Sequence, residues 1–179
     1  MLAFLTVGES GRIGRHSLAV RAGLGEGAVR TVLKRLREEG LSDADASGCY
    51  LTREGQEVYS SLSKKLSPLA TIDGSRLTMG DAQVAVLVRG GGAAVKSGIE
   101  QRDSAIGVGA AGATTYVVKG SRFTIPGGSD DCEKDFPGRA WTALRRRLKP
   151  RNGDAVILCG SEREETARLG ALSAALSLL

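Results

Sequence analysis

The chain has 179 residues, of which 41% are hydrophobic and 25% are charged, so it is long enough for one medium-sized domain or two small ones. Lys and Arg exceed Asp and Glu by five, which suits a polyanionic partner but is too small an excess to identify one. Aromatic residues make up only 4% of the chain, which argues against stacking platforms for single-stranded nucleic acid.

Neither a membrane segment nor a metal centre is indicated. No apolar run approaches the roughly 18 residues that cross a bilayer, and no basic segment precedes the apolar start as in a signal peptide. The three cysteines form no C-x-x-C pair and His16 is the only histidine, so a structural zinc site is not expected. We expect a cytoplasmic protein without a metal or another cofactor.

The first elements in the chain predict a winged helix-turn-helix. A short helix over residues 1–7 precedes a second helix in residues 11–22, and the sharp turn Gly23-Leu24-Gly25 follows it. The next helix has one apolar stripe at positions i, i+3, i+4 and i+7, namely Val29, Val32, Leu33 and Leu36. A short hairpin then ends at Thr52. In a helix-turn-helix with this order of elements, the second helix of the motif is the recognition helix and lies in a DNA groove.

Charge supports the same interpretation, because residues 11–37 contain seven Lys or Arg and a single acid, Glu26. Residues that project from the recognition helix are expected to contact bases, and residues at the start of the earlier helix are expected to contact phosphates. The residues predicted to bind DNA are Arg30, Thr31 and Lys34 in the first group and Arg12 and Arg15 in the second. The alternative is a solvated helix face, which is the common role of a basic run.

Thr52 is predicted to be the N-cap of a helix that runs to about Lys65. This helix either pairs two chains or only closes the core of its own domain. Residues 67–80 contain Pro68, Gly74 and Gly80 and are predicted to be a linker with a strand near residues 69–72. The predicted domains are therefore residues 1–66 and 81–179, on either side of this linker.

The second domain is predicted to be a small α/β domain. Strands are expected at residues 83–88, 113–118, 122–126 and 154–159, with helices that begin near residues 97 and 138 and at a capping box, Ser161 to Glu164. The order strand, helix, strand, strand, helix, strand is ferredoxin-like, with one added C-terminal helix. The fold class of the whole chain is therefore α+β.

One segment of the second domain has the composition of a ligand site. Arg102 and Asp103 are followed by a passage of small residues that leads into Thr114 and Thr115, which together supply space and polarity. We predict a small-molecule effector near these four residues; close packing of a helix on a strand is the alternative. A second basic block, residues 145–151, either contacts DNA flanks or another subunit, or complements a helix dipole.

The segments LAVRAGLGEGAVRTVLKRLREEGL and YLTREG resemble the helix-turn-helix and wing of prokaryotic winged-helix regulators over residues 11–65. The whole chain is similar to an uncharacterised archaeal family that pairs a winged helix with an α/β domain. Two features depart from the regulator pattern. Gly25 replaces the usual Ser or Thr cap of the recognition helix, and the wing contains Asp43 and Asp45 but no Lys or Arg.

The residues and the resemblance together favour a DNA-binding transcriptional regulator whose second domain senses a small molecule, dimerises, or does both. A homodimer is expected, because one winged helix covers few base pairs. The alternatives are an α/β enzyme joined to a winged helix and a protein-interaction module. We do not expect an enzyme, since no Ser-His-Asp set, paired carboxylates or metal ligands stand out.

Overall fold

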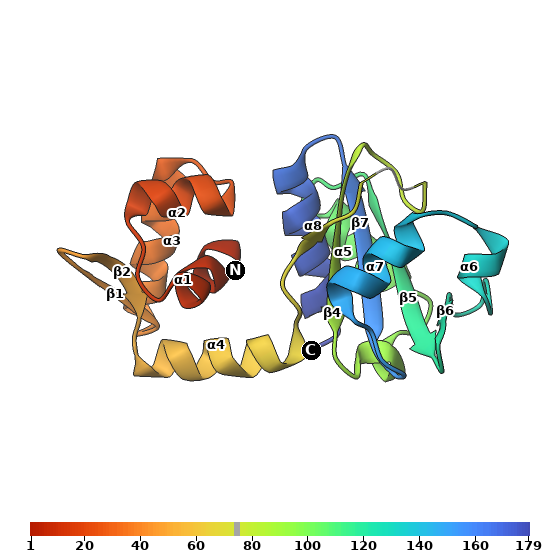
Figure 1. The fold of residues 1–179 in the computed structure, drawn as a ribbon. Helices are drawn as coiled ribbons and strands as arrows, with labels where there is room; N and C mark the ends of the chain where they lie inside the picture. Colours follow the sequence, from red (N-terminus) through yellow and green to blue (C-terminus); the bar gives the residue numbers. More distant parts are fainter. Residues whose placement is uncertain (74–75) are drawn as a thin grey trace. The chain divides into compact units, whose positions relative to one another are not determined.

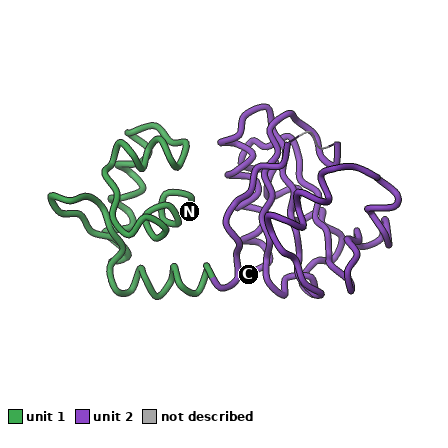
Figure 2. The backbone as a smooth tube through the Cα atoms, viewed as in Figure 1, with its two compact units in different colours: residues 1–63 green, residues 64–179 purple. Residues whose placement is uncertain are grey.

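The computed structural model describes residues 1–73 and 76–179, which fold into two compact units, Met1–Ser63 and Lys64–Leu179 (Figures 1 and 2). The sequence predicts a linker over residues 67–80. In the structure the described part of this segment belongs to the second unit, because strand β3 (Ala70–Thr71) pairs with the main sheet and Ile72 is buried. The predicted strand is present, but as the edge of a sheet.

Helices α1 (Leu2–Ser10), α2 (Arg15–Ala22) and α3 (Glu26–Glu38) form most of the first unit. Its core contains Leu2, Phe4, Val7, Leu18 and Val29. Helix α1 extends to Ser10, beyond the predicted end at residue 7. Gly8 packs closely against Tyr59, since a Cβ atom on it would lie 2.3 Å from the Tyr59 ring. Phe4 packs edge-on against the same ring, with 6.5 Å between the centroids.

The predicted helix, turn and helix are confirmed for α2 and α3. Gly23 ends α2 with a φ of 63°, in the left-handed region that favours glycine, and its N–H donates to the carbonyl of Val20 at 3.2 Å. Of the predicted apolar stripe on α3, Val29 is fully buried and the other three residues are partly buried. Gly25 precedes α3 without a side-chain cap, as its sequence implies.

Strands β1 (Ser42–Asp45) and β2 (Gly48–Leu51) pair antiparallel and form the predicted wing. The wing is also joined to the segment before α2, since the backbone groups of Ile13 and Cys49 exchange hydrogen bonds of 3.0 and 2.9 Å. Arg12 therefore lies directly beside the wing.

Helix α4 (Arg53–Lys65) begins as predicted, with the Thr52 hydroxyl accepting a hydrogen bond of 3.1 Å from the N–H of Gly55. The helix crosses the boundary between the units. Gly55 lies so close to the end of α3 that a Cβ atom would be 1.9 Å from the carbonyl oxygen of Leu41.

A pair of Gly-to-Ala changes tests this close approach. Gly55→Ala is expected to lower the free energy of unfolding by about 1–3 kcal/mol, because the Leu41 backbone has to move. Gly27→Ala, in α3, is expected to raise it by about 0.5–1 kcal/mol, because nothing lies within 4 Å of a Cβ at this position. Urea unfolding followed by circular dichroism compares the two variants, and equal effects would contradict the packing described.

The second unit contains one five-stranded antiparallel sheet in the order β3-β4-β7-β5-β6. Its other strands are β4 (Ala82–Val88), β5 (Gly112–Lys119), β6 (Arg122–Thr124) and β7 (Ala155–Ser161). The strands and helices that the sequence predicts occur in the predicted order along the chain, with a 3₁₀ turn and one short helix in addition. The last strand, β7, lies between β4 and β5, so β4, α5 and β5 form a split βαβ unit. A ferredoxin-like sheet has the third strand in this position, so the predicted chain order is present but the pairing of the strands is not ferredoxin-like.

Helices α5 (Ile99–Ile106) and α8 (Glu164–Leu176) cover one face of this sheet, and α7 (Ala140–Leu148) covers the other (Figure 1). The 3₁₀ turn η1 (Gly91–Ala94) follows β4, and the short helix α6 (Cys132–Asp135) lies next to β6. Small residues let α8 approach closely: a Cβ atom on Gly170 would be 2.6 Å from the Cys159 sulfur. Burial there raises the pKa of the Cys159 thiol to about 12.

Candidate nucleic-acid interface

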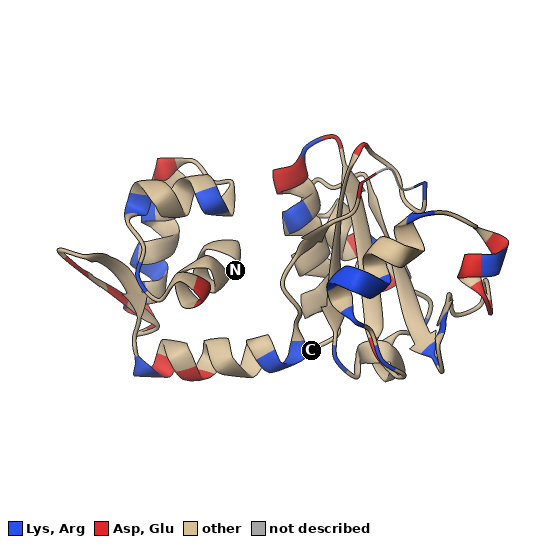
Figure 3. Cartoon of the chain, viewed as in Figure 1, with Lys and Arg blue, Asp and Glu red and all other residues tan. Residues whose placement is uncertain are grey.

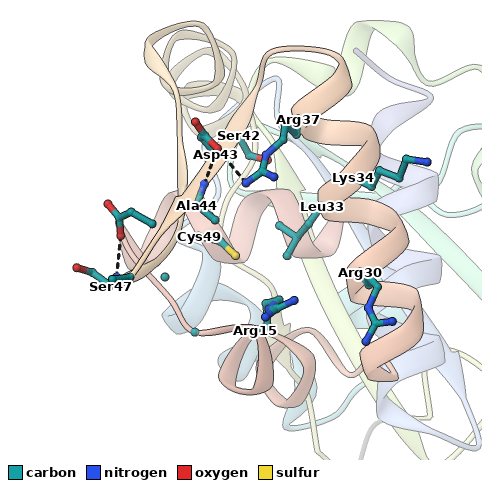
Figure 4. A pocket seen from close by; sticks show the side chains of 14 residues that line it. Arg15, Arg30, Leu33, Lys34, Arg37, Ser42, Asp43, Ala44, Ser47 and Cys49 are labelled. Carbon is teal, nitrogen blue, oxygen red and sulfur yellow. Dashed lines mark hydrogen bonds and ion pairs between the residues drawn. The ribbon is translucent and has the colours of Figure 1, made fainter.

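A groove of about 690 Å³ lies between α3 and the wing, within the first unit (Figure 4). We call it the wing groove; the residues that line it are Gly14, Arg15, Arg30, Leu33, Lys34, Arg37, Ser42, Asp43, Ala44, Asp45, Ala46, Ser47, Gly48 and Cys49. Three segments contribute to it: the start of α2, one face of α3 and most of the hairpin. The α3 residues are spaced i, i+3, i+4 and i+7, so one helix face points to the groove.

Three cations of the wing groove are available to a ligand. Arg15 and Arg30 are exposed and have no ion-pair partner among the residues that the structure describes. Lys34 pairs with Glu38 one turn later, at 3.7 Å, and both side chains are largely exposed. An exposed pair of this kind contributes little and exchanges readily for a phosphate. Arg15, Arg30 and Lys34 therefore form a cluster of positive charge from two helices.

The wing aspartates engage two further arginines. Arg37 pairs with Asp43 at 2.9 Å, as Figure 4 shows. Arg12 pairs with Asp45 and lies over the Tyr50 ring, 4.4 Å from its centroid. The hydrogen bond from Arg12 holds the pKa of Asp45 below its ordinary value. These two ion pairs lower the positive charge that residues 11–37 present to a partner.

The structure thus divides the five residues that the sequence predicts to bind DNA. Arg15, Arg30 and Lys34 line the wing groove together. Arg12 and Thr31 lie outside the lining. Arg12 is held in its ion pair with Asp45, and the Thr31 hydroxyl donates to the carbonyl of Gly27 at 3.1 Å. The sequence pattern did not reveal the pairs of Arg12 and Arg37, and the unusual aspartates of the wing were the available signal for them.

The four residues predicted to bind an effector do not converge. Arg102 and Asp103 are exposed and pair with each other at 3.0 Å. Thr114 donates to the carbonyl of Leu77 at 3.0 Å, on the face covered by α7, whereas Thr115 is buried on the opposite face, beside Gly98. Successive residues of a strand face opposite sides of a sheet, so these two threonines do not line one pocket.

Neither a metal-binding cluster nor a membrane-spanning helix is found in residues 1–73 and 76–179. Within these described ranges no group of three or more His, Cys, Asp or Glu side chains is placed to hold a metal ion. No helix in the same ranges has the length and apolar character that crossing a membrane requires.

Comparisons with known proteins give four results. Residues 4–66 match the family model described as the CggR N-terminal DNA binding domain. Among solved structures, the hypothetical protein PH0730 from Pyrococcus horikoshii OT3 is similar, with 26% identity, a TM-score of 0.73, and coverage of 99% of this chain and 92% of that chain. No curated protein matches. Residues 79–178, more than half of the sequence, match the domain of unknown function DUF4443, and the chain belongs to this family.

Proposed function

We propose that the protein is a DNA-binding transcriptional regulator that holds duplex DNA in the wing groove. The observation that carries the proposal is the cluster of Arg15, Arg30 and Lys34 around this groove, with no acid in a strong pair with any of them. Phosphates of a duplex are the natural partner of three exposed cations on a helix-turn-helix. The match of residues 4–66 to a DNA binding domain family supports the same partner.

Salt dependence tests the proposal. Fluorescence anisotropy of the full chain with a labelled random duplex is measured at salt concentrations from about 50 to 200 mM. Three phosphate contacts give a log-log slope of about −2.7, so a slope at least this steep is expected. Absence of binding at the lowest salt, or binding that does not depend on salt, contradicts the proposal.

The two other functional classes make different predictions. An enzyme predicts turnover by the second unit, but the only histidine, His16, lies exposed in the first unit, where its ring nitrogen is 3.1 Å from Glu26. A protein-interaction module predicts that duplex DNA does not bind while the cations of the wing groove stay exposed. The anisotropy titration distinguishes a protein-interaction module from a regulator. Of the enzyme class, we propose that the protein has no enzymatic activity.

Removing a charge from the wing aspartates is predicted to strengthen the binding of duplex DNA. Asp45→Asn is expected to raise the affinity for random duplex about twofold to fivefold, because it removes a negative charge and releases Arg12. Asparagine keeps the oxygen that accepts the Ser47 N–H in the turn at 2.8 Å. Glu9→Gln on α1 removes the same charge outside the groove lining and serves as the control. Equal affinities of the two variants would contradict a role for the wing.

We also propose a homodimer paired through the second unit. Ile99 and Ile106 are 51% and 48% exposed, and their seven-residue separation places them on one face of α5. A partner chain would cover this apolar face, and two winged helices would match a palindromic site. Light scattering is expected to give a dimer mass for the wild type and a monomer mass for Ile106→Glu. A monomeric wild type would remove the proposal.

Ligand sensing is a second proposed role of the same unit. The side-chain oxygens of Gln101 and Thr115 are buried without a hydrogen-bond partner among the described residues, an uncommon state that a polar ligand would relieve. An effector at 100 times its dissociation constant raises stability by about 2.7 kcal/mol. A thermal screen of metabolites against wild type and Gln101→Leu tests this role, and hits that shift both proteins equally would place the site elsewhere.

A further inference from the structure

The positive charge of the protein is carried by its second unit. Residues 1–63 contain eight Lys or Arg and eight Asp or Glu, whereas residues 64–179 contain 17 and 12. The whole net charge of +5 therefore belongs to the second unit, although the groove described above lies in the first.

Eight exposed cations gather at one end of the second unit, and we call this surface the basic end (Figure 3). Its residues are Lys64, Lys65, Lys119, Arg122, Arg146, Arg147, Lys149 and Arg151. None of the eight has an ion-pair partner among the residues that the structure describes. Without them, the second unit contains nine basic and 12 acidic residues, so the rest of its surface is net negative.

Backbone contacts show that these cations share one end of the sheet. The strand termini Val88 and Ala155 are paired, and Lys119 pairs with Arg122 across the β5–β6 turn. The Asn152 side chain accepts the N–H of Gly120 at 2.8 Å, which joins this turn to the loop after α7.

Two more hydrogen bonds complete the arrangement. The N–H of Arg89 donates to the carbonyl of Lys65 at 2.7 Å, and the Arg89 side chain donates to the carbonyl of Lys149 at 3.3 Å. The end of α4 and the end of α7 therefore both lie at this end of the sheet.

The acids at this end are already engaged. Asp154 is buried and pairs with Arg89 at 2.9 Å, and it also accepts the N–H groups of Gly90 and Arg151. Glu133 is held by two hydrogen bonds from Arg145, at 2.8 and 2.9 Å. Neither of these acids is free to pair with the eight cations, and an anion that bound there would reduce the repulsion between them.

Helix dipoles explain only part of the cluster. Lys64, Lys65, Arg146 and Arg147 lie in the last turns of α4 and α7, where a cation is favoured. Lys119 and Arg122 are in strands and Arg151 is in a loop, where no helix end attracts them. Cations from separate segments that converge on one surface are the electrostatic footprint of nucleic-acid binding.

We infer that the basic end is a second binding surface for the phosphate backbone of duplex DNA, separate from the wing groove. The inference rests on the proposed function, since it assumes that duplex DNA is the partner of the chain. Lys and Arg side chains without a recognition helix contact phosphates and do not read bases. The basic end should therefore add affinity and salt dependence without adding sequence preference.

Three full-length proteins test the inference. The first has Lys119→Gln, Arg147→Gln and Arg151→Gln. The magnitude of its salt slope is expected to fall by about 2.7 when all three residues contact phosphate, and by at least about 0.9 when one does. The control has Arg76→Gln, Arg139→Gln and Arg163→Gln, the same loss of charge in the same unit outside the basic end. It is expected to keep the wild-type slope. Thermal melts confirm that both variants are folded.

The third protein has Arg15→Ala, Arg30→Ala and Lys34→Ala in the wing groove, and it separates failure of the inference from failure of the proposed function. If this protein loses binding while the basic-end variant keeps the wild-type slope, the inference alone is wrong. If the wild type does not bind duplex DNA at all, both are wrong. If the wild type binds vesicles containing anionic lipid and the basic-end variant does not, with equal slopes on DNA, a membrane is the partner of this surface and the inference is overturned.

Discussion

On random duplex, where all three side chains contact phosphates, the change Arg15→Ala, Arg30→Ala and Lys34→Ala is expected to reduce the magnitude of the salt slope by about 2.7, which corresponds to about 500-fold in affinity at 0.1 M salt. The three side chains line one groove, and none has a strong ion pair to lose. Their only expected interaction of consequence is with the phosphates and bases of the duplex.

Arg35→Ala is the matched control for this prediction. Arg35 is an exposed residue of the same helix, α3, but it does not line the wing groove. The control should therefore change the slope by much less than about 0.9. A large loss for Arg35→Ala, or a small loss for the triple variant, would mean that the duplex contacts another face of α3.

The single variants separate base contacts from phosphate contacts. A preferred sequence is first selected from a random duplex pool with the wild-type protein. Arg30→Ala is then expected to cost about 1–3 kcal/mol on the selected sequence and less on random duplex. Arg15→Ala, at the start of α2, should weaken both to the same extent. Equal losses on the two duplexes for Arg30→Ala would make Arg30 a phosphate contact.

The helix-turn-helix and wing were predictable because their signals are local. The apolar stripe of α3 repeats within one helix, and Thr52 caps the helix that it immediately precedes. The comparisons agree, since residues 4–66 match a DNA binding domain family and the similar solved structure comes from an archaeon, as the resemblance implied. In contrast, the pair between Arg12 and Asp45 joins residues 33 positions apart, and no spacing rule links them.

In the second unit, too, the sequence predicted the local elements but not the contacts between distant segments. Its strands and helices follow the predicted order, but the position of β7 between β4 and β5 depends on pairing between distant segments. Strand alternation alone separates Thr114 from Thr115, because neighbouring residues of a strand face opposite ways, so a shared pocket for the two conflicts with the strand predicted there. The start of α8 also differs from the prediction: Ser161 remains in β7, so the helix begins at Glu164 without the predicted capping box.

The basic block at residues 145–151 is visible in the sequence, but its partners are not. Arg145 is engaged with Glu133 and lies over the Phe123 ring, 4.9 Å from its centroid, so it supports the fold. Arg146 and Arg147 have no ion-pair partner among the described residues and join cations from β5, β6 and α4. Only the folded sheet brings these segments to one end of the second unit and so forms the basic end.

Trp141 is the residue whose loss is expected to reduce the stability of the second unit most. Trp141 is 4% exposed, and the centroid of its ring lies 5.1 Å from those of both Tyr116 and Phe123, between α7 and the sheet. The indole N–H donates to the carbonyl of Phe136 at 2.8 Å, which fixes the segment before the helix. Leu144 and Leu148 follow on the same face and are also buried. This residue therefore anchors α7 on the sheet.

Trp141→Ala is expected to lower the free energy of unfolding by about 3–5 kcal/mol, because it opens a cavity beneath α7 and leaves the Phe136 carbonyl without its donor. Trp141→Phe keeps an aromatic ring and should cost clearly less. Guanidinium unfolding followed by far-UV circular dichroism measures both, since Trp141 is the only tryptophan and its fluorescence is lost with it. If the two variants were equally stable, the aromatic cluster would not be what holds α7, and the apolar contacts of Leu144 and Leu148 would have to account for its position.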